Sequence, residues 1–143
     1  MKPTRPIRGQ TLGIFGLGRI GRSTALRAQA LGMTVIAVEN FPDEEFVQRH
    51  GIELVELAAL LARADFLSVH CPVTEETTGM FNADLFGRMK PDSVFINTAR
   101  GKLYVEADLI DALNNGPLSG AGLDVFEQEP LPETHPLSLG SGG

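Results

Sequence analysis

Short apolar runs alternate with segments of helical periodicity along most of this chain. Compact apolar runs predict six strands, at residues 11–15, 34–38, 52–55, 66–69, 93–96 and 120–125. Apolar positions at helical spacing predict helices between them, at residues 19–31, 43–50, 56–64, 82–89 and 106–114. Because the strands have no polar face of their own, they predict a parallel sheet covered on both sides. The pattern therefore indicates an α/β fold with a doubly wound parallel sheet of the Rossmann type.

The first predicted helix follows a cluster of glycines at the end of the first strand. Ile20, Thr24, Ala28 and Leu31 share one face of this helix at helical spacing. Gly32 ends the helix, because glycine readily adopts the left-handed conformation found at helix C-termini. The segment therefore predicts a strand, a glycine-rich turn and a helix, in that order.

Length, composition and charge fit a single globular domain. The chain has 143 residues, of which 43% are hydrophobic and 21% charged, and its formal net charge is −6. This charge, and the lack of any run of Lys or Arg, argue against a nucleic-acid or anionic-membrane partner. No apolar stretch approaches the roughly 20 residues that cross a bilayer, and the N-terminus lacks the apolar core of a secretory signal. With Cys71 as the single cysteine, we expect a reducing, cytoplasmic setting.

The glycine cluster reads Gly-Leu-Gly-Arg-Ile-Gly, with glycines at Gly16, Gly18 and Gly21. The first glycine permits a tight turn, the second lets the backbone approach a pyrophosphate, and the third allows the helix to pack closely on the strand. The phosphates would meet N–H groups at the positive helix N-terminus, where Arg19 and Ile20 lie. Because glycine turns are common, the motif alone is also compatible with a purely structural strand–helix turn.

Glu39 ends the strand that follows the glycine turn and its helix. An acidic residue at this place accepts hydrogen bonds from the ribose 2′-OH of NAD and repels the 2′-phosphate of NADP. No Lys or Arg follows Glu39 until Arg49, so the downstream sequence offers no partner for that phosphate. The pattern therefore favours NAD as the cofactor, and the alternative is that Glu39 is only a solvated strand end.

Three further segments are more specific than a nucleotide-binding fold. They read VHCPVTEETTG at 69–79, FINTARG at 95–101 and GAGLDVFEQEP at 120–130. In order and spacing they resemble the D-isomer-specific 2-hydroxyacid dehydrogenases, a family that includes phosphoglycerate, glyoxylate/hydroxypyruvate, D-lactate and formate dehydrogenases. The resemblance covers roughly residues 9–132. It implies an NAD-binding domain of an enzyme that passes a hydride between NAD(H) and a 2-hydroxy or 2-keto acid.

The resemblance implies two catalytic residues. Arg100 matches the arginine that pairs with the substrate carboxylate and polarises its carbonyl, a role that suits a planar guanidinium. Glu129 matches the acid that supports the catalytic histidine, fixing its tautomer and raising its basicity. The alternatives are a surface arginine at a helix start and an exposed glutamate in a proline-rich loop.

The resemblance also implies residues that contact NAD. Asp124 matches a position near the nicotinamide carboxamide, and Thr98 and Ala99 match positions that line the nicotinamide ring. The adenine and pyrophosphate side is matched by three more residues, Cys71, Pro72 and Thr77. For the cysteine, a role as a small buried apolar residue is an equally good interpretation, and nothing supports a nucleophile.

Two parts of a complete enzyme are missing from the sequence. The family's acid/base histidine follows one further strand, and His50, His70 and His135 do not match it, although His70 is expected to line the cofactor pocket. The substrate domain is also absent. Residues 1–8 form an N-terminal segment, residues 9–130 the dinucleotide-binding domain, and residues 131–143 a flexible tail, linker or truncation, or a natural loop cut at an arbitrary point.

One departure from the family pattern lies at the start of the last predicted helix. The family has a Val-Asp-Glu step there, and this chain has Tyr104, Val105 and Glu106. Loss of an Asp N-cap typically costs roughly 1 kcal/mol, so we expect this helix start to be loosened.

Three functional hypotheses follow. The first is the NAD-binding domain of a dehydrogenase that works only in the complete enzyme. The second is an inert NAD(H)-binding module, such as a co-repressor-like sensor or a scaffold. The third is another user of glycine turns, such as an SAM-dependent methyltransferase, which the segments 95–101 and 120–130 disfavour. In either of the first two cases an isolated domain is expected to expose apolar surface, which favours self-association, including a homodimer.

Overall fold

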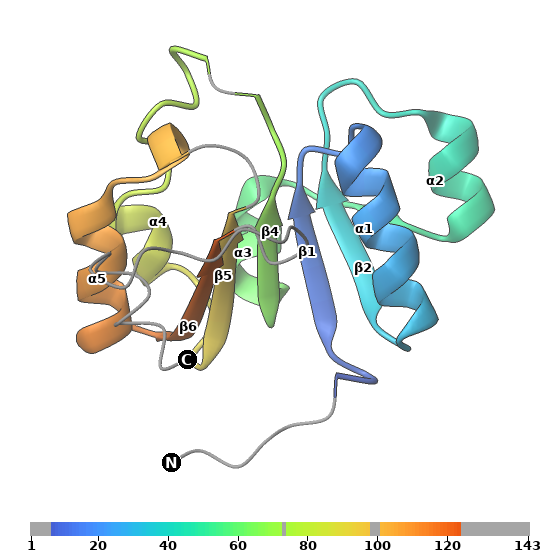
Figure 1. Ribbon diagram of the computed structural model, residues 1–143. Coiled ribbons are helices and arrows are strands. Elements are labelled where there is room, and N and C mark those ends of the chain that lie inside the picture. Colours follow the sequence, from blue (N-terminus) through green and yellow to red (C-terminus); the bar gives the residue numbers. More distant parts are fainter. Residues whose placement is uncertain (1–6, 73, 98–100, 124–143) are drawn as a thin grey trace.

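A parallel six-stranded sheet forms the centre of the computed structural model, which describes residues 7–72, 74–97 and 101–123 (Figure 1). The strand order is β3-β2-β1-β4-β5-β6, the order of a doubly wound dinucleotide-binding sheet. The strands are β1 (Thr11–Phe15), β2 (Thr34–Val38), β3 (Glu53–Leu54), β4 (Phe66–Val69), β5 (Ser93–Asn97) and β6 (Leu118–Leu123). The predicted fold class is confirmed, and β6 begins two residues earlier than predicted, while residues 124 and 125 lie outside the described part of the chain.

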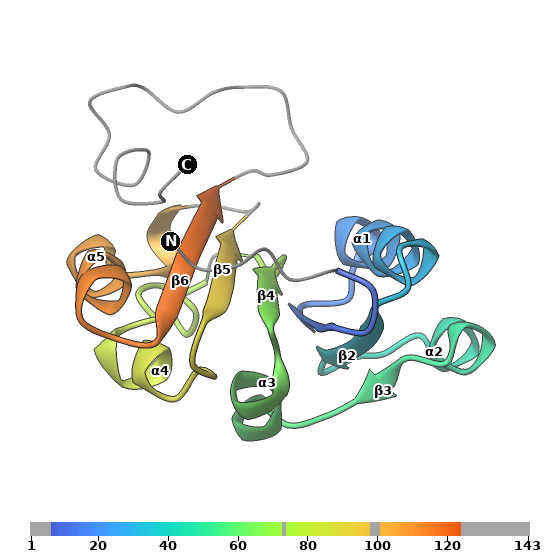
Figure 2. The same ribbon diagram turned by 90° about the horizontal axis from the view of Figure 1, so that it is seen from below.

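Helices cover the sheet from both sides. They are α1 (Arg19–Ala30), α2 (Glu44–His50), α3 (Leu57–Arg63), α4 (Ala83–Gly87) and α5 (Glu106–Asn114), with a short 3-10 turn at Gly101–Leu103. Figure 2 shows α1 on one face of the sheet and α3 and α4 on the other. Helix α4 is shorter than predicted, because Asn82 is its N-cap and accepts a hydrogen bond from the backbone N–H of Leu85. Its five residues end before Met89.

Alternation along the strands divides the core into two layers. In β1, Leu12 and Ile14 face α1 and belong to one buried cluster. In β4, Leu67 and Val69 face the other side, where α3, α4 and α5 pack and where Phe81, Phe86, Phe95 and Tyr104 form an aromatic cluster. The two layers hold the strands rigidly, so that the loops at the carboxyl ends of β1, β2 and β4 are fixed relative to one another.

The face of α1 that packs on the sheet differs from the predicted one. Thr24 and Ala28 are buried as predicted, but Ile20 is 61% exposed and Leu31 is 56% exposed. The buried side is made instead of the small residues Gly21, Thr24, Ala25 and Ala28. Small side chains let the helix lie close to the strands, so α1 sits deep against β1 and presents its N-terminus at the edge of the sheet.

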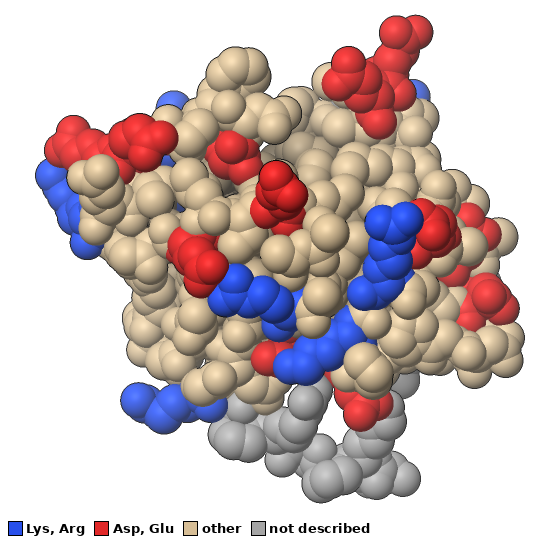
Figure 3. All heavy atoms as spheres, turned by 180° about the vertical axis from the view of Figure 1, so that it is seen from behind, with Lys and Arg blue, Asp and Glu red and all other residues tan. Residues whose placement is uncertain are grey.

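Charged side chains of both signs are interspersed on the face shown in Figure 3. Ion pairs within the described ranges include Arg63 with Glu53, Arg88 with Asp84, and Lys90 with the buried Asp65. This distribution is unlike the continuous basic field of a nucleic-acid-binding face. Across residues 7–72, 74–97 and 101–123, every helix is too short or too polar to span a bilayer.

Helix α5 begins without a side-chain cap, as the sequence predicted. Its N-cap is Val105, which makes no side-chain hydrogen bond to the helix. The carboxylate of Asp108, in the first turn, accepts a hydrogen bond from the backbone N–H of Ala83 at 3.0 Å. Asp108 therefore ties α5 to α4, and the N-cap residue of α5 offers no side-chain acceptor to the N–H groups of the first turn.

Val105→Asp is expected to raise the free energy of unfolding by about 1 kcal/mol, because it supplies an acceptor for the N–H groups of the first turn. Val105→Asn tests the hydrogen bond without the charge, and Val105→Ala removes the side chain without adding an acceptor. Urea denaturation of the four proteins measures the differences. Equal stability of the Asp, Asn and Ala variants would show that this helix start is already satisfied.

Candidate functional site

A pocket of about 800 Å³ opens where the carboxyl ends of β1, β2 and β4 meet. The strand order reverses between β1 and β4, and ligands of open α/β sheets bind at such a switch point. The lining residues come from the ends of these strands and the loops that follow them: Phe15, Gly16, Val38, Glu39, Asn40, Phe41, Cys71, Pro72, Thr74, Glu76 and Thr77. The pocket thus joins the glycine turn, the predicted ribose acid and the segment after β4.

Two glycines of the turn are required by the backbone itself. Gly16 has φ +99°, and a Cβ there would lie 2.7 Å from the backbone nitrogen of Cys71. Its N–H donates to the carbonyl of Val38 at 3.0 Å, which fixes the turn to β2. A Cβ on Gly21 would collide with the carbonyl oxygen of Gly16. These two positions therefore need glycine for close approach, as the motif predicted.

Gly18 has no such structural requirement. Its φ of −82° and ψ of −160° are extended values open to any residue. A Cβ at Gly18 would have no atom of the described residues within 4 Å. The fold therefore tolerates a side chain here, and the open space in front of Gly18 is available to a ligand.

The open space at Gly18 adjoins the N-terminus of α1. Gly18 is the N-cap and offers no side-chain hydrogen bond, and the first turn contains no acidic residue. Arg19 and Ile20 follow with exposed side chains, so these predicted residues lie at the mouth of the site. A helix start without its own acceptor favours an anion.

Glu39 closes the pocket on the side of β2. One carboxylate oxygen accepts a hydrogen bond from the N–H of Leu17 at 2.6 Å, and the other accepts from the N–H of Phe41 at 3.0 Å. Leu17 lies between the first two glycines, so Glu39 bonds directly to the glycine turn. The interpretation of Glu39 as only a solvated strand end does not fit these contacts.

The segment after β4 forms the opposite wall. The hydroxyl of Thr77 donates to the carbonyl of Pro72 at 2.9 Å and accepts from the N–H of Thr74 at 2.7 Å. Cys71 lines the pocket but is only 7% exposed. Burial raises the pKa of its thiol, so the thiol stays protonated and is a poor nucleophile. The structure thus brings Cys71, Pro72 and Thr77 together with Gly16 and Glu39.

His70 is not among the residues that line this pocket. Its Nε2 makes a 2.7 Å hydrogen bond with the hydroxyl of the fully buried Ser68. Alternation along the strand points Ser68 and His70 to one face and Cys71 to the other. Burial lowers the pKa of His70 to about 4, so the ring is neutral near pH 7. His50, at the end of α2, packs against the ring of Phe46 instead.

Lowering the pH toward 4 is expected to destabilise the fold through His70. The folded imidazole titrates near 4, below its ordinary value of 6.5, so between these values the unfolded chain binds one more proton. The free energy of unfolding therefore falls as the pH drops through 6.5, by about 2 kcal/mol after allowance for partial exposure. Urea denaturation at pH 7 and pH 4.5 should show a smaller loss for His70→Gln than for wild type. His50→Gln is the control and should lose as much free energy of unfolding as wild type. Equal losses of stability in all three proteins would exclude His70 as the cause of the acid destabilisation.

Several predicted site residues lie outside the described residues. They are Thr98, Ala99, Arg100, Asp124 and Glu129, and their roles stay predictions. Four residues that line the pocket were not predicted from the sequence: Asn40, Phe41, Thr74 and Glu76. They could have been found only from their position, since they follow β2 and β4 at the ligand-binding edge of the sheet. In the described ranges, no three His, Cys, Asp or Glu side chains are grouped to hold a metal ion.

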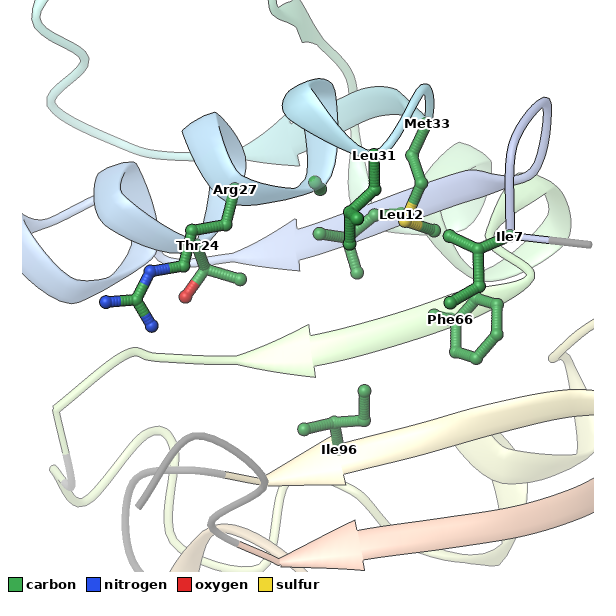
Figure 4. A pocket seen from close by; sticks show the side chains of 9 residues that line it. Ile7, Leu12, Thr24, Arg27, Leu31, Met33, Phe66 and Ile96 are labelled. Carbon is green, nitrogen blue, oxygen red and sulfur yellow. The ribbon is translucent and has the colours of Figure 1, made fainter.

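A second pocket, of about 610 Å³, lies on the face of the sheet beside α1 (Figure 4). Its lining is apolar except for Thr24 and Arg27: Ile7, Leu12, Thr24, Arg27, Ala28, Leu31, Met33, Phe66 and Ile96. Figure 4 shows Leu31, Met33 and Ile7 gathered at one end of the pocket. Such a lining offers a dinucleotide few hydrogen bonds, so we do not assign the cofactor here.

Comparison with known proteins agrees with this geometry. Residues 1–140 match the family described as D-isomer specific 2-hydroxyacid dehydrogenase, NAD binding domain. The chain belongs to this family. A solved structure of the D-isomer specific 2-hydroxyacid dehydrogenase from Lactobacillus delbrueckii ssp. bulgaricus, in its NAD-complexed form, superposes with a TM-score of 0.81 at 31% identity. That superposition covers 92% of this chain and 43% of the other.

Curated relatives are similar at the level of sequence. A glyoxylate reductase of Korarchaeum cryptofilum is 45% identical over 131 residues, which are 92% of this chain and 40% of the relative. A hydroxypyruvate reductase of Blautia hydrogenotrophica is 41% identical over 135 residues, which are 94% of this chain and 42% of the relative. The chain therefore spans about two fifths of the length of these two relatives.

Proposed function

We propose that this chain binds NAD(H) at the carboxyl ends of β1, β2 and β4 and forms the cofactor half of a 2-hydroxyacid dehydrogenase. The observation that carries the proposal is the glycine at position 18. The fold does not need it, yet it lies at an uncapped helix start beside the pocket. A pyrophosphate there requires a backbone without a side chain.

Residues around Gly18 are suited to bind the remaining parts of NAD. The adenine ribose is proposed to lie at Glu39, whose carboxylate accepts from its hydroxyls, and the adenine between Phe41 and Pro72. Both of these residues line the pocket and are exposed, Phe41 by 89%. The acid at the ribose favours NAD over NADP. Thr98, Ala99 and Asp124 are proposed to hold the nicotinamide end.

The proposed reaction of the complete enzyme is hydride transfer between NAD(H) and C2 of a 2-hydroxy or 2-keto acid. The cofactor supplies the hydride, Arg100 pairs with the substrate carboxylate, and Glu129 supports a histidine outside this sequence. The names of the two curated relatives, a glyoxylate reductase and a hydroxypyruvate reductase, support a small 2-keto acid as substrate. Without its acid/base group, an enzyme of this kind loses roughly 10²–10⁴-fold in rate.

A second candidate is an NAD(H)-binding module without turnover, since the described residues of the pocket suit cofactor binding. The apolar pocket beside α1 supports the proposal that the chain self-associates, as a homodimer in the simplest case. The buried, single Cys71 fits the proposed cytoplasmic setting.

Binding and turnover assays test both candidates, because both require NADH binding, and turnover by this chain alone would exclude the inert module. We expect the chain to bind NADH but to show no turnover of glyoxylate, hydroxypyruvate or pyruvate above the rate without protein.

Arg100→Ala should change the free energy of NADH binding by less than about 1 kcal/mol, because the guanidinium serves the substrate. Fluorescence titration of both proteins measures this. A much larger loss would make Arg100 a cofactor residue and remove it from the proposed substrate site.

A further inference from the structure

Glu39 and Arg22 hold the two sides of one residue, Leu17, in the glycine turn. The N–H of Leu17 donates to Glu39 at 2.6 Å, and the carbonyl of Leu17 accepts from Nε of Arg22 at 3.2 Å. The side chain of Leu17 is 2% exposed and packs in the core. The backbone of Leu17 is therefore a fixed point, with a carboxylate on one side and a guanidinium on the other.

The carboxylate of Glu39 occupies a place toward which two backbone donors point. The N–H groups of Leu17 and Phe41 both end on its oxygens, and they come from different loops. Convergent backbone N–H groups bind phosphate oxygens as readily as carboxylate oxygens. If the carboxylate were absent, the N–H of Leu17 would stay in place, because the Leu17 side chain is buried and its carbonyl accepts from Arg22.

Arg22 contacts the same residue of the glycine turn, Leu17, that donates to the Glu39 carboxylate. It projects from α1 and bonds to the carbonyl of Leu17, and its NH1 lies 3.3 Å from Asp43, the N-cap of α2. Its guanidinium carbon stands 5.4 Å from the centre of the Phe46 ring. Arg22 therefore spans from the glycine turn to the far end of the loop that carries Glu39. Its side chain is 37% exposed, so it can turn toward an anion.

We infer that Glu39 fills a latent phosphate-monoester site, formed by the N–H groups of Leu17 and Phe41 with Arg22 as its cation. The inference rests on the proposed function, because it places the adenine ribose of the cofactor at Glu39. A 2′-phosphate would have to occupy the position of the carboxylate and would be repelled by it. Two residues thus determine the choice between NAD and NADP. Glu39 covers a site that would otherwise suit the 2′-phosphate of NADP, and Arg22 supplies the cation of that site.

The test uses four proteins besides wild type: Glu39→Ala, Arg22→Gln, the double variant and Glu44→Ala. Glu44 is exposed on α2, so Glu44→Ala removes the same charge without touching the site. Two matched ligand pairs differ only by the 2′-phosphate: NADH with NADPH, and 5′-AMP with adenosine 2′,5′-bisphosphate. Titration of each ligand gives dissociation constants, and the ratio within a pair isolates the contribution of the phosphate.

In wild type and Glu44→Ala we expect the ligand without the 2′-phosphate to bind at least about tenfold tighter. Glu39→Ala should reverse this preference and tighten binding of the phosphorylated ligand by about tenfold or more over wild type. In the double variant, loss of Arg22 should remove most of that gain, by about fivefold or more, while the ratio in Glu44→Ala stays at the wild-type value. High salt should reduce the gain of Glu39→Ala, because it screens the guanidinium.

Three results would overturn the inference. The first is a Glu39→Ala protein that binds NADH or 5′-AMP but gains no affinity for the ligands with a 2′-phosphate. The second is a gain that survives Arg22→Gln, which would exclude Arg22 as the cation. The third is a double variant that is weakened equally for both members of a pair, since that pattern belongs to a merely structural Arg22. A wild-type chain that binds neither NADH nor 5′-AMP would instead contradict the proposed function, so the two failures are distinguishable.

Discussion

Gly18→Ala is expected to weaken NADH binding by about 10- to 100-fold while leaving the fold as stable as before. The backbone of Gly18 is extended, and a methyl group there has no protein atom of the described residues within 4 Å. Alanine lowers the entropy of the unfolded chain but is a poorer N-cap residue than glycine, so the free energy of unfolding should change by less than about 1 kcal/mol. The methyl group would project into the space proposed for the pyrophosphate.

Fluorescence titration with NADH and urea denaturation of the same preparation measure the two effects. Gly87→Ala is a suitable control, because Gly87 lies in α4 away from the pocket and a Cβ there also meets open space. The control should bind NADH like wild type. If Gly18→Ala bound NADH as tightly as the control does, the phosphates would not lie at the start of α1.

Gly16→Ala is expected to act on the fold itself and to lower the free energy of unfolding by about 2–4 kcal/mol. An alanine at φ +99° is strained, and its Cβ would lie 2.7 Å from the nitrogen of Cys71, which is backbone and cannot move aside cheaply. Either β1 must separate from the segment after β4 or the turn must change shape. Both responses would also disturb the pocket, so NADH binding should fall with stability.

Gly9 provides the matched control for this second prediction. Its φ is +87°, close to that of Gly16, but a Cβ at Gly9 would have no neighbour within 4 Å among the described residues. Gly9→Ala therefore measures the strain of the positive φ alone, at about 1–2 kcal/mol. The further loss in Gly16→Ala is the cost of the contact with Cys71. Equal urea midpoints for the two variants would show that the turn accommodates the methyl group.

The features that depend on local sequence could be predicted with good accuracy. The limits of β1, β2, β4 and α5 agree with the predicted ones, because apolar runs and helical spacing mark them directly. The close approach of Gly16 and the missing cap at Val105 follow from the residue types alone. The acid at position 39 was placed at the end of a strand, and it lies beside the turn as that placement requires.

The features that depend on neighbours distant in sequence could not be predicted. Apolar spacing put Ile20 and Leu31 on the face with Thr24 and Ala28, but the helix packs through its smaller residues, because Gly21 lies against the turn. Helical spacing predicts which residues share a face of the helix, but it does not predict how closely that face approaches the sheet.

Arg22 and His70 illustrate the same limit. A search for a cation along the sequence after Glu39 reaches Arg49, whereas the structure places Arg22, from the preceding helix, beside the same turn. His70 was expected at the pocket because it ends a strand, yet it faces the buried Ser68. Which of two consecutive residues faces a pocket depends on the register of a strand against its neighbours, and a single sequence does not contain this register.

Titration of the chain with NADH, and with NADPH in parallel, tests the central claim most directly. The chain is proposed to hold the cofactor with its own residues, without the remaining three fifths of a full-length relative. We predict saturable binding of one NADH per chain, with NADPH at least about tenfold weaker. A chain that is folded by circular dichroism, yet shows no saturable binding of NADH, would contradict the account.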